Sequence, residues 1–273
     1  MMRVLYSQWK ASVDHQNRNV LNLLVALLLV AVCDLASAAS LQIAAAADLA
    51  VCMQELNAAF STAHAGAEIK SNIGSSGAFF AQITNGAPFD VFLSADLDYP
   101  RALALAGKAD AATLVVYAHG QLVLFSADPS VSLAQGFKAF DDPRIKRIAI
   151  ANPDIAPYGR AARAALQHAG VWNTVQTRLV FGENIAQTAQ FVTTGNAQAG
   201  LVSSAQAGQR DSSAGRSVWI VPPDWYPTIE QGGIVTAYGK SNPLAREYLA
   251  FLQNANGRTI LHRYGFTLPT PRQ

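Results

Sequence analysis

The side chains best suited to bind a ligand are two serines in a loop of small residues. Ser75 and Ser76 lie in the segment NIGSSGA at 72–78, which predicts the end of a strand, a tight loop and then a helix over 79–83. The glycines at 74 and 77 let the backbone approach a ligand closely. A helix N-terminus presents unpaired N–H groups and a partial positive charge. The segment is therefore typical of an anion-binding loop, although small residues before a helix are also ordinary loop chemistry.

A second loop of the same kind lies upstream. A predicted strand over 41–43 is followed by alanines and then by Asp48, which stands at an N-cap position. An amphipathic helix over 49–64 is predicted next, because apolar residues recur at three- and four-residue spacing, at Leu49, Cys52, Met53, Leu56 and Phe60. Two such units would place two helix N-termini at the carboxyl edge of a parallel sheet, where open α/β sheets bind ligands. Together they favour an oxyanion or phosphate-like ligand.

The elements that must position these loops alternate between strands and helices along the chain. Two further helices are predicted to begin near Tyr158 and Ile185, after strands at 145–151 and 179–181. Runs at 114–125 and 233–238 predict strands that cross between lobes, and terminal helices are predicted at 243–253 and 257–264. This pattern indicates an α/β fold of two lobes with a ligand cleft between them. We assign 39–120 plus 235–273 to lobe 1 and 121–234 to lobe 2.

The first 38 residues are predicted to be a signal peptide rather than part of the fold. Basic residues at 3, 10 and 18 precede an apolar run over 23–32, and ASA at 36–38 supplies a cleavage site. A retained membrane anchor is the alternative. Cleavage would leave Cys52 as the only cysteine, so no internal disulfide is expected. Because Cys52 falls on the apolar face of its helix, its expected role is packing.

Composition argues against one class of partner. Of the 273 residues, 51% are hydrophobic and 14% are charged, and the formal net charge is +2 with Lys and Arg scattered along the chain. Nucleic-acid binding relies on a clustered basic surface, which this distribution does not predict.

Patterns for catalysis and metal binding are weak. The histidines are isolated, and neither an HExxH motif nor a Cys/His cluster occurs. GSSG at 74–77 is one residue shorter than the G-x-S-x-G nucleophile elbow. Asp90 and Asp96 bracket a predicted strand, and we expect them to form salt bridges or caps. A secreted serine hydrolase using Ser75 or Ser76 is a second hypothesis, and it lacks a partnered base.

Six segments carry a family resemblance. They are AAAADL at 44–49, GSSG at 74–77, QITNGAPFDVFLSAD at 82–96, ANPDIAPYG at 151–159, GENIAQ at 182–187 and RYGF at 263–266. Over 41–268 the chain resembles the periplasmic molybdate-binding proteins, which are the substrate-binding subunits of ABC importers. The resemblance implies the two-lobed fold of type II periplasmic binding proteins.

The resemblance also implies a ligand set. Ser76 matches a hydroxyl ligand, and Tyr158 and Ile185 match positions whose backbone N–H groups bind the oxyanion. Asp48 stands where the family usually has serine, and Ser203 stands where a tyrosine hydroxyl often reaches the ligand. A carboxylate donates no hydrogen bond unless it is protonated. Either Asp48 turns away to cap its helix and offers only its N–H, or this branch of the family binds its ligand differently.

The expected function is therefore oxyanion capture rather than catalysis. The predicted binding residues are Asp48, Ser75, Ser76, Tyr158, Ile185 and Ser203, with molybdenum held as molybdate through Asp48, Ser76, Tyr158 and Ile185. By the resemblance, the protein is a periplasmic monomer without a cofactor, which binds molybdate and also tungstate and passes it to a membrane permease. A binder of another oxyanion, such as sulfate, is the alternative within this class.

Overall fold

The computed structural model describes residues 40–208 and 217–269. The predicted signal peptide and its cleavage site lie outside the described residues. The described residues belong to one compact unit, which begins at Ser40. Within the described part of the chain, every helix is too short or too polar to cross a membrane.

The first of the two sheets has five strands in the order β2-β1-β3-β10-β4. Its strands are β1 (Ser40–Ala46), β2 (Glu68–Gly74), β3 (Val91–Ser94), β4 (Val115–Gly120) and β10 (Ile229–Val235). Strand β1 runs parallel to both β2 and β3, and β10 is antiparallel to β3 and β4. The three parallel strands therefore end at the same edge of the sheet.

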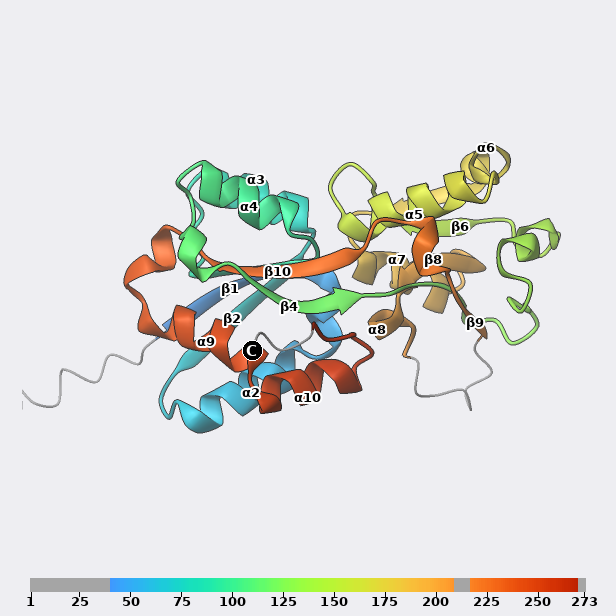
Figure 1. Ribbon diagram of the computed structural model, residues 1–273. Coiled ribbons are helices and arrows are strands. Elements are labelled where there is room, and N and C mark those ends of the chain that lie inside the picture. Colours follow the sequence, from blue (N-terminus) through green and yellow to red (C-terminus); the bar gives the residue numbers. More distant parts are fainter. Residues whose placement is uncertain (1–39, 209–216, 270–273) are drawn as a thin grey trace, which may run out of the picture. The chain divides into compact units, whose positions relative to one another are not determined.

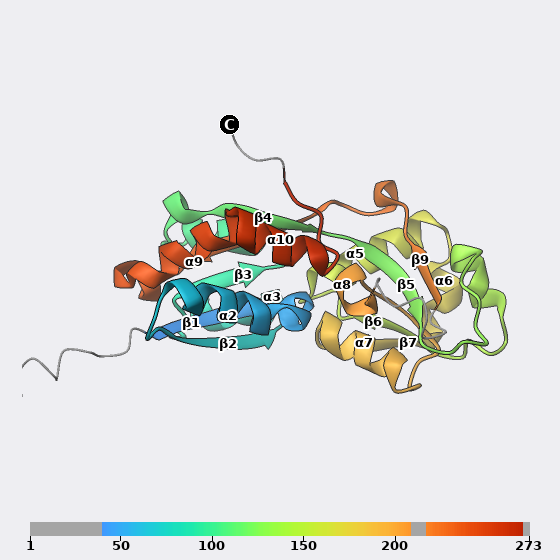
Figure 2. The same cartoon turned by 90° about the horizontal axis from the view of Figure 1, so that it is seen from below.

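Helices cover both faces of this sheet, as Figure 1 shows. Alternating side chains of β1 divide the packing: Leu41 and Ile43 pack in one buried cluster, and Ala44 in another. The first cluster includes residues of α2 (Met53–Ala63), α9 (Pro243–Gln253) and α10 (Ala255–Arg263), which lie on one face (Figure 2). The second includes residues of α3 (Ser76–Thr84) and α4 (Asp98–Leu105) on the other face. Successive side chains of a strand point to opposite faces of the sheet, so each residue of β1 packs against the helices on its own face.

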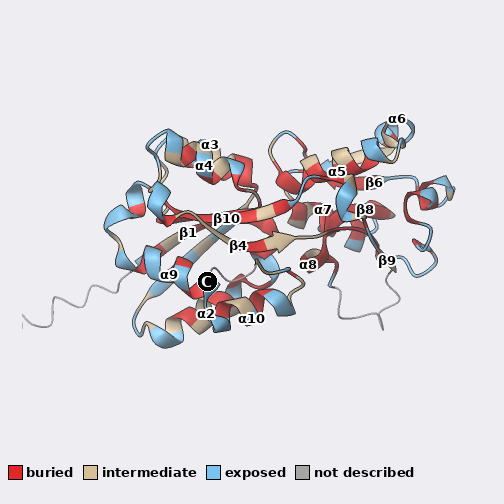
Figure 3. Cartoon of the chain, in the orientation of Figure 1, coloured by how far each residue is buried: buried red, intermediate tan, exposed pale blue. Residues whose placement is uncertain are grey.

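The second sheet has the order β7-β6-β8-β5-β9. Its strands are β5 (Leu122–Ser126), β6 (Ile148–Ala151), β7 (Leu179–Gly182), β8 (Ala199–Ser203) and β9 (Ser217–Ile220). Strand β6 is parallel to β7 and β8, whereas β5 is antiparallel to β8 and β9. The accompanying helices are α5 (Pro157–His168), α6 (Trp172–Val175), α7 (Ile185–Thr193) and α8 (Ser204–Ala207). One large buried cluster joins β5, β6 and β8 to α5 and α7, and these three strands are buried along their whole length, as the red colour of β6 and β8 in Figure 3 shows.

Short 3₁₀ segments complete the described elements. They are η1 (Ala47–Val51), η2 (Ala111–Thr113), η3 (Gly136–Asp141), η4 (Gln176–Arg178), η6 (Pro223–Trp225) and η7 (Tyr238–Ser241).

Two connections carry the chain between the sheets. The first leads from β4 to β5 through Gln121, which confirms the strand pair predicted over 114–125. The second leads from β9 back to β10, whose pairing with β4 begins at Ile229, earlier than the strand predicted at 233–238. The two-lobed α/β fold is thus present. The lobe boundaries assigned above, 39–120 plus 235–273 and 121–234, stay a prediction.

Two helix starts differ from the sequence prediction. The predicted helix over 49–64 is divided into η1 and α2, and Asp48 lies inside η1, whose N-cap is Ala46. The expectation that Asp48 caps this helix is therefore wrong, because its side chain is directed to other partners described below. Helix α3 begins at Ser76 with Ser75 as its N-cap, ahead of the predicted start at Phe79.

Candidate functional site

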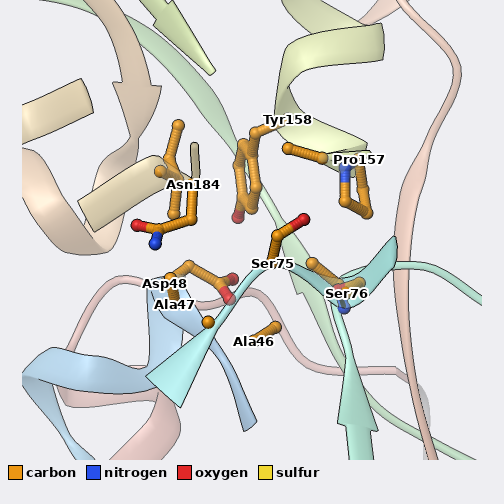
Figure 4. Close-up of a pocket in the computed structure, with 12 residues that line it drawn as sticks. Ala46, Ala47, Asp48, Ser75, Ser76, Pro157, Tyr158 and Asn184 are labelled. Atoms are coloured by element: carbon orange, nitrogen blue, oxygen red, sulfur yellow. Dashed lines mark hydrogen bonds between the residues drawn. The ribbon is translucent and has the colours of Figure 1, made fainter. Parts of the chain in front are cut away.

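The candidate site lies where two parallel strand pairs end. In the first sheet Ala46 of β1 is opposite Gly74 of β2, and in the second sheet Ala151 of β6 is opposite Gly182 of β7. Each of these strands leads into a helical segment within a few residues: η1, α3, α5 and α7. Their starts surround a cavity, and Figure 4 shows residues of its lining: Ala46, Ala47, Asp48, Gly74, Ser75, Ser76, Ala95, Ala156, Pro157, Tyr158, Asn184 and Ile185.

The two serines at the start of α3 have different hydrogen bonds. Ser76 is buried, and its Oγ accepts a 3.0 Å hydrogen bond from the backbone N–H of Ala95. Its hydroxyl proton thereby remains available for an acceptor in the cavity. The hydroxyl of Ser75 instead donates to the carbonyl oxygen of Ile155, at 2.6 Å. Ser76 is consequently the better donor for a bound anion.

Helix α5 contributes backbone donors from the second sheet. Pro157 occupies its first turn and has no N–H, and the next residue, Tyr158, is buried with its ring beside the cavity (Figure 4). The N–H groups in the first turn of a helix have no intrahelical carbonyl to bind. Gly159 allows this turn to approach β6, because a Cβ at that position would meet the carbonyl oxygen of Ala151 at 2.3 Å.

Helix α7 begins with a side-chain cap. The Oδ1 of Asn184 accepts a 3.0 Å hydrogen bond from the N–H of Gln187, and the Oε1 of Gln187 accepts a 2.7 Å bond from the N–H of Glu183. These reciprocal bonds fix the start of the helix. The N–H of Ile185 lies in the first turn and needs no intrahelical carbonyl, so it can serve a ligand.

Asp48 places a carboxyl group at the wall of the cavity. It is fully buried, and its Oδ2 accepts a hydrogen bond from the Nε2 of Gln231, which also donates to the hydroxyl of Tyr158 at 3.3 Å. No hydrogen-bond partner for its Oδ1 is found in the described structure. Burial raises the pKa of Asp48 to about 6, although hydrogen bonds from Gln231 and Tyr158 act in the opposite direction.

The lining carries no side-chain cation. Among the described residues that surround the cavity, none is Lys, Arg or His, so Asp48 is the only side chain there that bears a charge at neutral pH. Among the described residues, no group of three or more His, Cys, Asp or Glu side chains could hold a metal ion. The arrangement can therefore bind an anion through helix N-termini and a hydroxyl, without a salt bridge.

The structure brings together five of the six predicted site residues. Asp48, Ser75, Ser76, Tyr158 and Ile185 all line the cavity, whereas Ser203 does not. Ser203 ends β8 and caps α8, with its Oγ accepting a 3.1 Å hydrogen bond from the N–H of Gln206. The Nε2 of Gln206 then donates to the carbonyl oxygen of Ala47 at 2.9 Å. Ser203 thus contacts the wall of the cavity only through Gln206.

Sequence analysis missed two polar residues near the cavity. Asn184 was recognisable as a cap, since Asn followed three residues later by Gln is a capping pattern. Gln231 had no comparable signal, because the predicted strand began after it. It lies in β10 beside a β-bulge, which shifts the register with β4 between Gln231 and Gly232.

The remaining polar predictions have structural roles. The Oδ2 of Asp90 accepts a 2.7 Å hydrogen bond from the N–H of Gln42, and Asp96 forms an ion pair with Arg160 and accepts from the N–H of Tyr99. The ion pair confirms the salt-bridge role predicted for Asp96. Asp90 instead binds the backbone N–H of a strand residue, which is neither a salt bridge nor a helix cap. Cys52 is buried in the core cluster of the first sheet, which confirms its expected packing role.

Comparison with known proteins places the chain in a family. The model of the bacterial extracellular solute-binding proteins matches residues 41–267. Molybdate-binding protein ModA of Azotobacter vinelandii is 37% identical over 233 residues, covering 85% of this chain and 92% of the relative. The ModA of Rhodobacter capsulatus is 39% identical over 231 residues, covering 85% and 89%.

A solved structure agrees with these sequence matches. The periplasmic molybdate-binding protein of Azotobacter vinelandii superposes with a TM-score of 0.78 at 32% identity, covering 84% of this chain and 100% of that one.

Proposed function

The chain belongs to the bacterial extracellular solute-binding proteins, and from this premise we propose that it captures molybdate in the periplasm for an ABC importer. Tungstate is a second expected ligand, because it has the charge and tetrahedral shape of molybdate. The ligand assignment is supported by two relatives named as molybdate-binding proteins, at 37% and 39% identity over most of both chains.

The observation that carries the proposal is the convergence of helix starts on one cavity without a cation. The first turns of α3, α5 and α7 line it, together with the available hydroxyl of Ser76. Hydrogen bonds to a charged partner stabilise a complex by about 1.5–3 kcal/mol each, so several of them offset the desolvation of a dianion.

The residues proposed to contact molybdate are those at the starts of these segments. Ser76 would donate from its hydroxyl, and Tyr158 and Ile185 from their backbone N–H groups. Ser75 is proposed to hold the loop in place through Ile155 rather than to bind the anion. Asp48 is the remaining member of the set.

Contacts between segments of the two sheets support a closed arrangement. The N–H of Gly77 and the hydroxyl of Ser75 both donate to the carbonyl oxygen of Ile155, at 2.9 and 2.6 Å. Arg160 of α5 pairs with Asp96, which follows β3. Closure of two lobes around a ligand is a recurrent way to bury it. We propose that a membrane permease recognises this arrangement when the anion is bound.

We propose no catalytic step for this cavity. The described residues around the cavity include no His or Lys that could accept a proton from Ser75 or Ser76, and the two relatives are named as binding proteins. A serine hydrolase needs such a base within hydrogen-bond reach of its nucleophile. We propose further that the protein acts as a monomer without a cofactor, which light scattering after gel filtration would test.

Isothermal titration of the purified protein with molybdate, tungstate, sulfate and phosphate tests the function. We expect one-to-one binding of molybdate and tungstate, with weaker binding of sulfate. A response to sulfate or phosphate alone would keep the anion site and reject molybdate as the ligand. An absence of binding to all four anions would reject the proposed function.

A further inference from the structure

Asp48 places a buried carboxyl group in the wall of the cavity, and an ionised carboxylate would be unfavourable in a site that binds anions. The carboxyl group is fully buried and lines the cavity, and its Oδ1 lacks a partner in the described structure. In Figure 4 the carboxyl group of Asp48 lies near the hydroxyl of Tyr158 and on the side of the two serines. An ionised carboxylate here would repel a dianion, because water screens charges poorly at a buried position.

We infer that Asp48 binds the oxyanion as a neutral carboxylic acid, donating a proton from Oδ1 to an anion oxygen, so that each dianion is bound together with one proton. This inference rests on the proposed oxyanion-binding function. The balance is simple: the protein takes one proton from solvent when the dianion binds and returns it when the dianion leaves. A protonated carboxyl group has one O–H donor, which an ionised one lacks.

The neighbouring side chains determine which oxygen carries the proton. The Nε2 of Gln231 donates to Oδ2, which suits the carbonyl oxygen of a carboxylic acid, because that oxygen acts only as an acceptor. Oδ1 is then the oxygen left for the proton. Burial raises the pKa of Asp48 to about 6 in the protein without ligand, and a dianion beside the group would raise it further. The proton is thus available near neutral pH.

The titratable groups nearest to Asp48 are neutral. Tyr158 of α5, Tyr117 of β4 and Cys52 before α2 all interact with Asp48, and burial raises the pKa of each. These groups keep their own protons throughout the neutral range. They cannot supply the positive charge that would stabilise an ionised Asp48.

The charged residues on the surrounding elements are paired elsewhere. Glu55 of α2 pairs with Arg263, and Glu68 and Lys70 of β2 pair with each other at 3.0 Å. The Glu230 carboxylate on β10 lies 4.0 Å from the ring of His119.

The charged side chains on the helices of the second sheet also have other partners. On α5, Arg160 pairs with Asp96 and Arg163 with Asp154, while the ring of His168 stacks on Trp225. Helices α7 and α8, over 185–193 and 204–207, contain no titratable side chain. Within the described residues, Asp48 is therefore the group whose titration should govern anion binding near neutral pH.

The inference predicts the sign of the pH effect. Below about pH 6 Asp48 is already protonated, and the affinity for a dianion should be constant. Above that value each pH unit should lower the affinity about tenfold, because the missing proton must be taken up. An anion that carries its own proton, such as hydrogen phosphate, would instead donate to an ionised Asp48.

Titration calorimetry of the wild-type protein tests the inference directly. Molybdate is titrated in buffers of different ionisation enthalpy, at about pH 7.5 and about pH 5.5, and the buffer dependence of the heat counts the protons exchanged. We expect uptake close to one proton at the higher pH and much less at the lower. Binding at both pH values without proton uptake would overturn the inference while leaving the proposed function intact. An absence of binding at both would reject the function and the inference together.

Two variants assign the proton to its residue. Asp48→Asn keeps a donor of similar shape but cannot titrate, so its affinity should not vary with pH and its binding should take up no proton. Asp90→Asn removes another buried carboxyl group, one that accepts a backbone N–H outside the cavity. This control should keep the proton uptake of the wild type. Proton uptake that persists in Asp48→Asn would place the proton on another group and overturn the inference. If this variant does not fold, the proton uptake measured for the wild-type protein decides between the two outcomes.

Discussion

The hydroxyl of Ser75 donates a 2.6 Å hydrogen bond to the carbonyl oxygen of Ile155, which joins the loop after β2 to the loop after β6. The backbone N–H of Gly77 donates to the same oxygen at 2.9 Å. Ser76, between these two residues, is directed to the N–H of Ala95 and keeps its own proton free. Of three consecutive residues at the start of α3, two therefore contact the other lobe, and the third keeps a hydroxyl proton available for the ligand contact proposed above.

Replacement of Ser76 should weaken anion binding. Ser76→Ala removes a hydroxyl donor from the cavity, and losing a hydrogen bond to a charged partner costs about 1–3 kcal/mol of binding free energy. It also leaves the N–H of Ala95 without its acceptor, so some loss of unfolding free energy is expected. Calorimetry with molybdate and urea denaturation measure the two effects separately.

Ser132→Ala is a suitable control for this variant. Ser132 is exposed, and its hydroxyl also accepts a backbone N–H, from Ala134 at 3.5 Å. Its replacement should leave the affinity unchanged. Wild-type affinity in Ser76→Ala would remove Ser76 from the proposed site.

A methyl group at Gly77 should oppose closure of the lobes. A Cβ at this position would lie 2.6 Å from the carbonyl oxygen of Ile155 and 2.7 Å from the hydroxyl of Tyr99. Gly77→Ala should therefore separate the two loops and raise the dissociation rate of the anion, with affinity reduced at least tenfold, about 1.4 kcal/mol. Stopped-flow fluorescence would measure the rate, and the exposed substitution Gln82→Ala on the same helix is the control. Unchanged dissociation in Gly77→Ala would show that closure does not depend on this contact.

Local patterns predicted the fold well where they were strong. The helix predicted at 243–253 has the same bounds as α9, and the strand–loop–helix units at 145–168 and 179–193 are present. The start of α2 was misplaced because a polar residue before an apolar run is typical of a cap, whereas Asp48 is drawn into contact with Gln231. That contact joins residues 183 positions apart in the chain. Spacing along the sequence does not report such a contact.

The candidate site was predicted to the extent that it consists of helix starts. Loop composition alone located Ser76, and family resemblance added Tyr158 and Ile185. Ser75 and Ser76 differ because the hydroxyl of Ser75 donates to Ile155, whereas the hydroxyl of Ser76 accepts from Ala95 and faces the cavity. These contacts depend on how the two lobes pack, which the local sequence does not specify. Gln231 was not predicted either, because its contact with Asp48 also arises only from packing between distant segments.

Removing the buried charge of Asp48 should stabilise the protein without ligand. Its pKa is raised from 3.8 to about 6, so the folded state binds the proton more tightly than the unfolded state does. The stabilising contribution is complete below about pH 4 and is lost as the pH rises through about 6, with a total of about 3 kcal/mol. Asp48→Asn should therefore be more stable than the wild type at about pH 7.5, and the difference should shrink toward about pH 4.

Urea denaturation at several pH values, without anion, measures this difference. Carboxyl groups nearer the surface, such as those of Asp110 and Asp142, whose pKa values are lowered by hydrogen bonds from arginines, act with the opposite sign. They are common to both proteins, so the comparison of variant with wild type cancels them. A difference that stays constant with pH would mean that Asp48 does not titrate in this range.

Replacing Asp48 by serine should give a protein that binds a dianion at least as tightly as the wild type does at neutral pH. The hydroxyl introduced by Asp48→Ser would donate without first taking up a proton, whereas the wild type loses affinity about tenfold for each pH unit above about 6. The gain should therefore be about tenfold or more near pH 7.5 and should vanish near pH 5.5, where Asp48 is protonated. Because the shorter side chain also frees Gln231 from its buried partner, the urea stability of the variant is measured beside its affinity for molybdate. A large loss of affinity at both pH values, in a variant that remains folded, would mean that the carboxyl group makes a contact that a hydroxyl cannot replace.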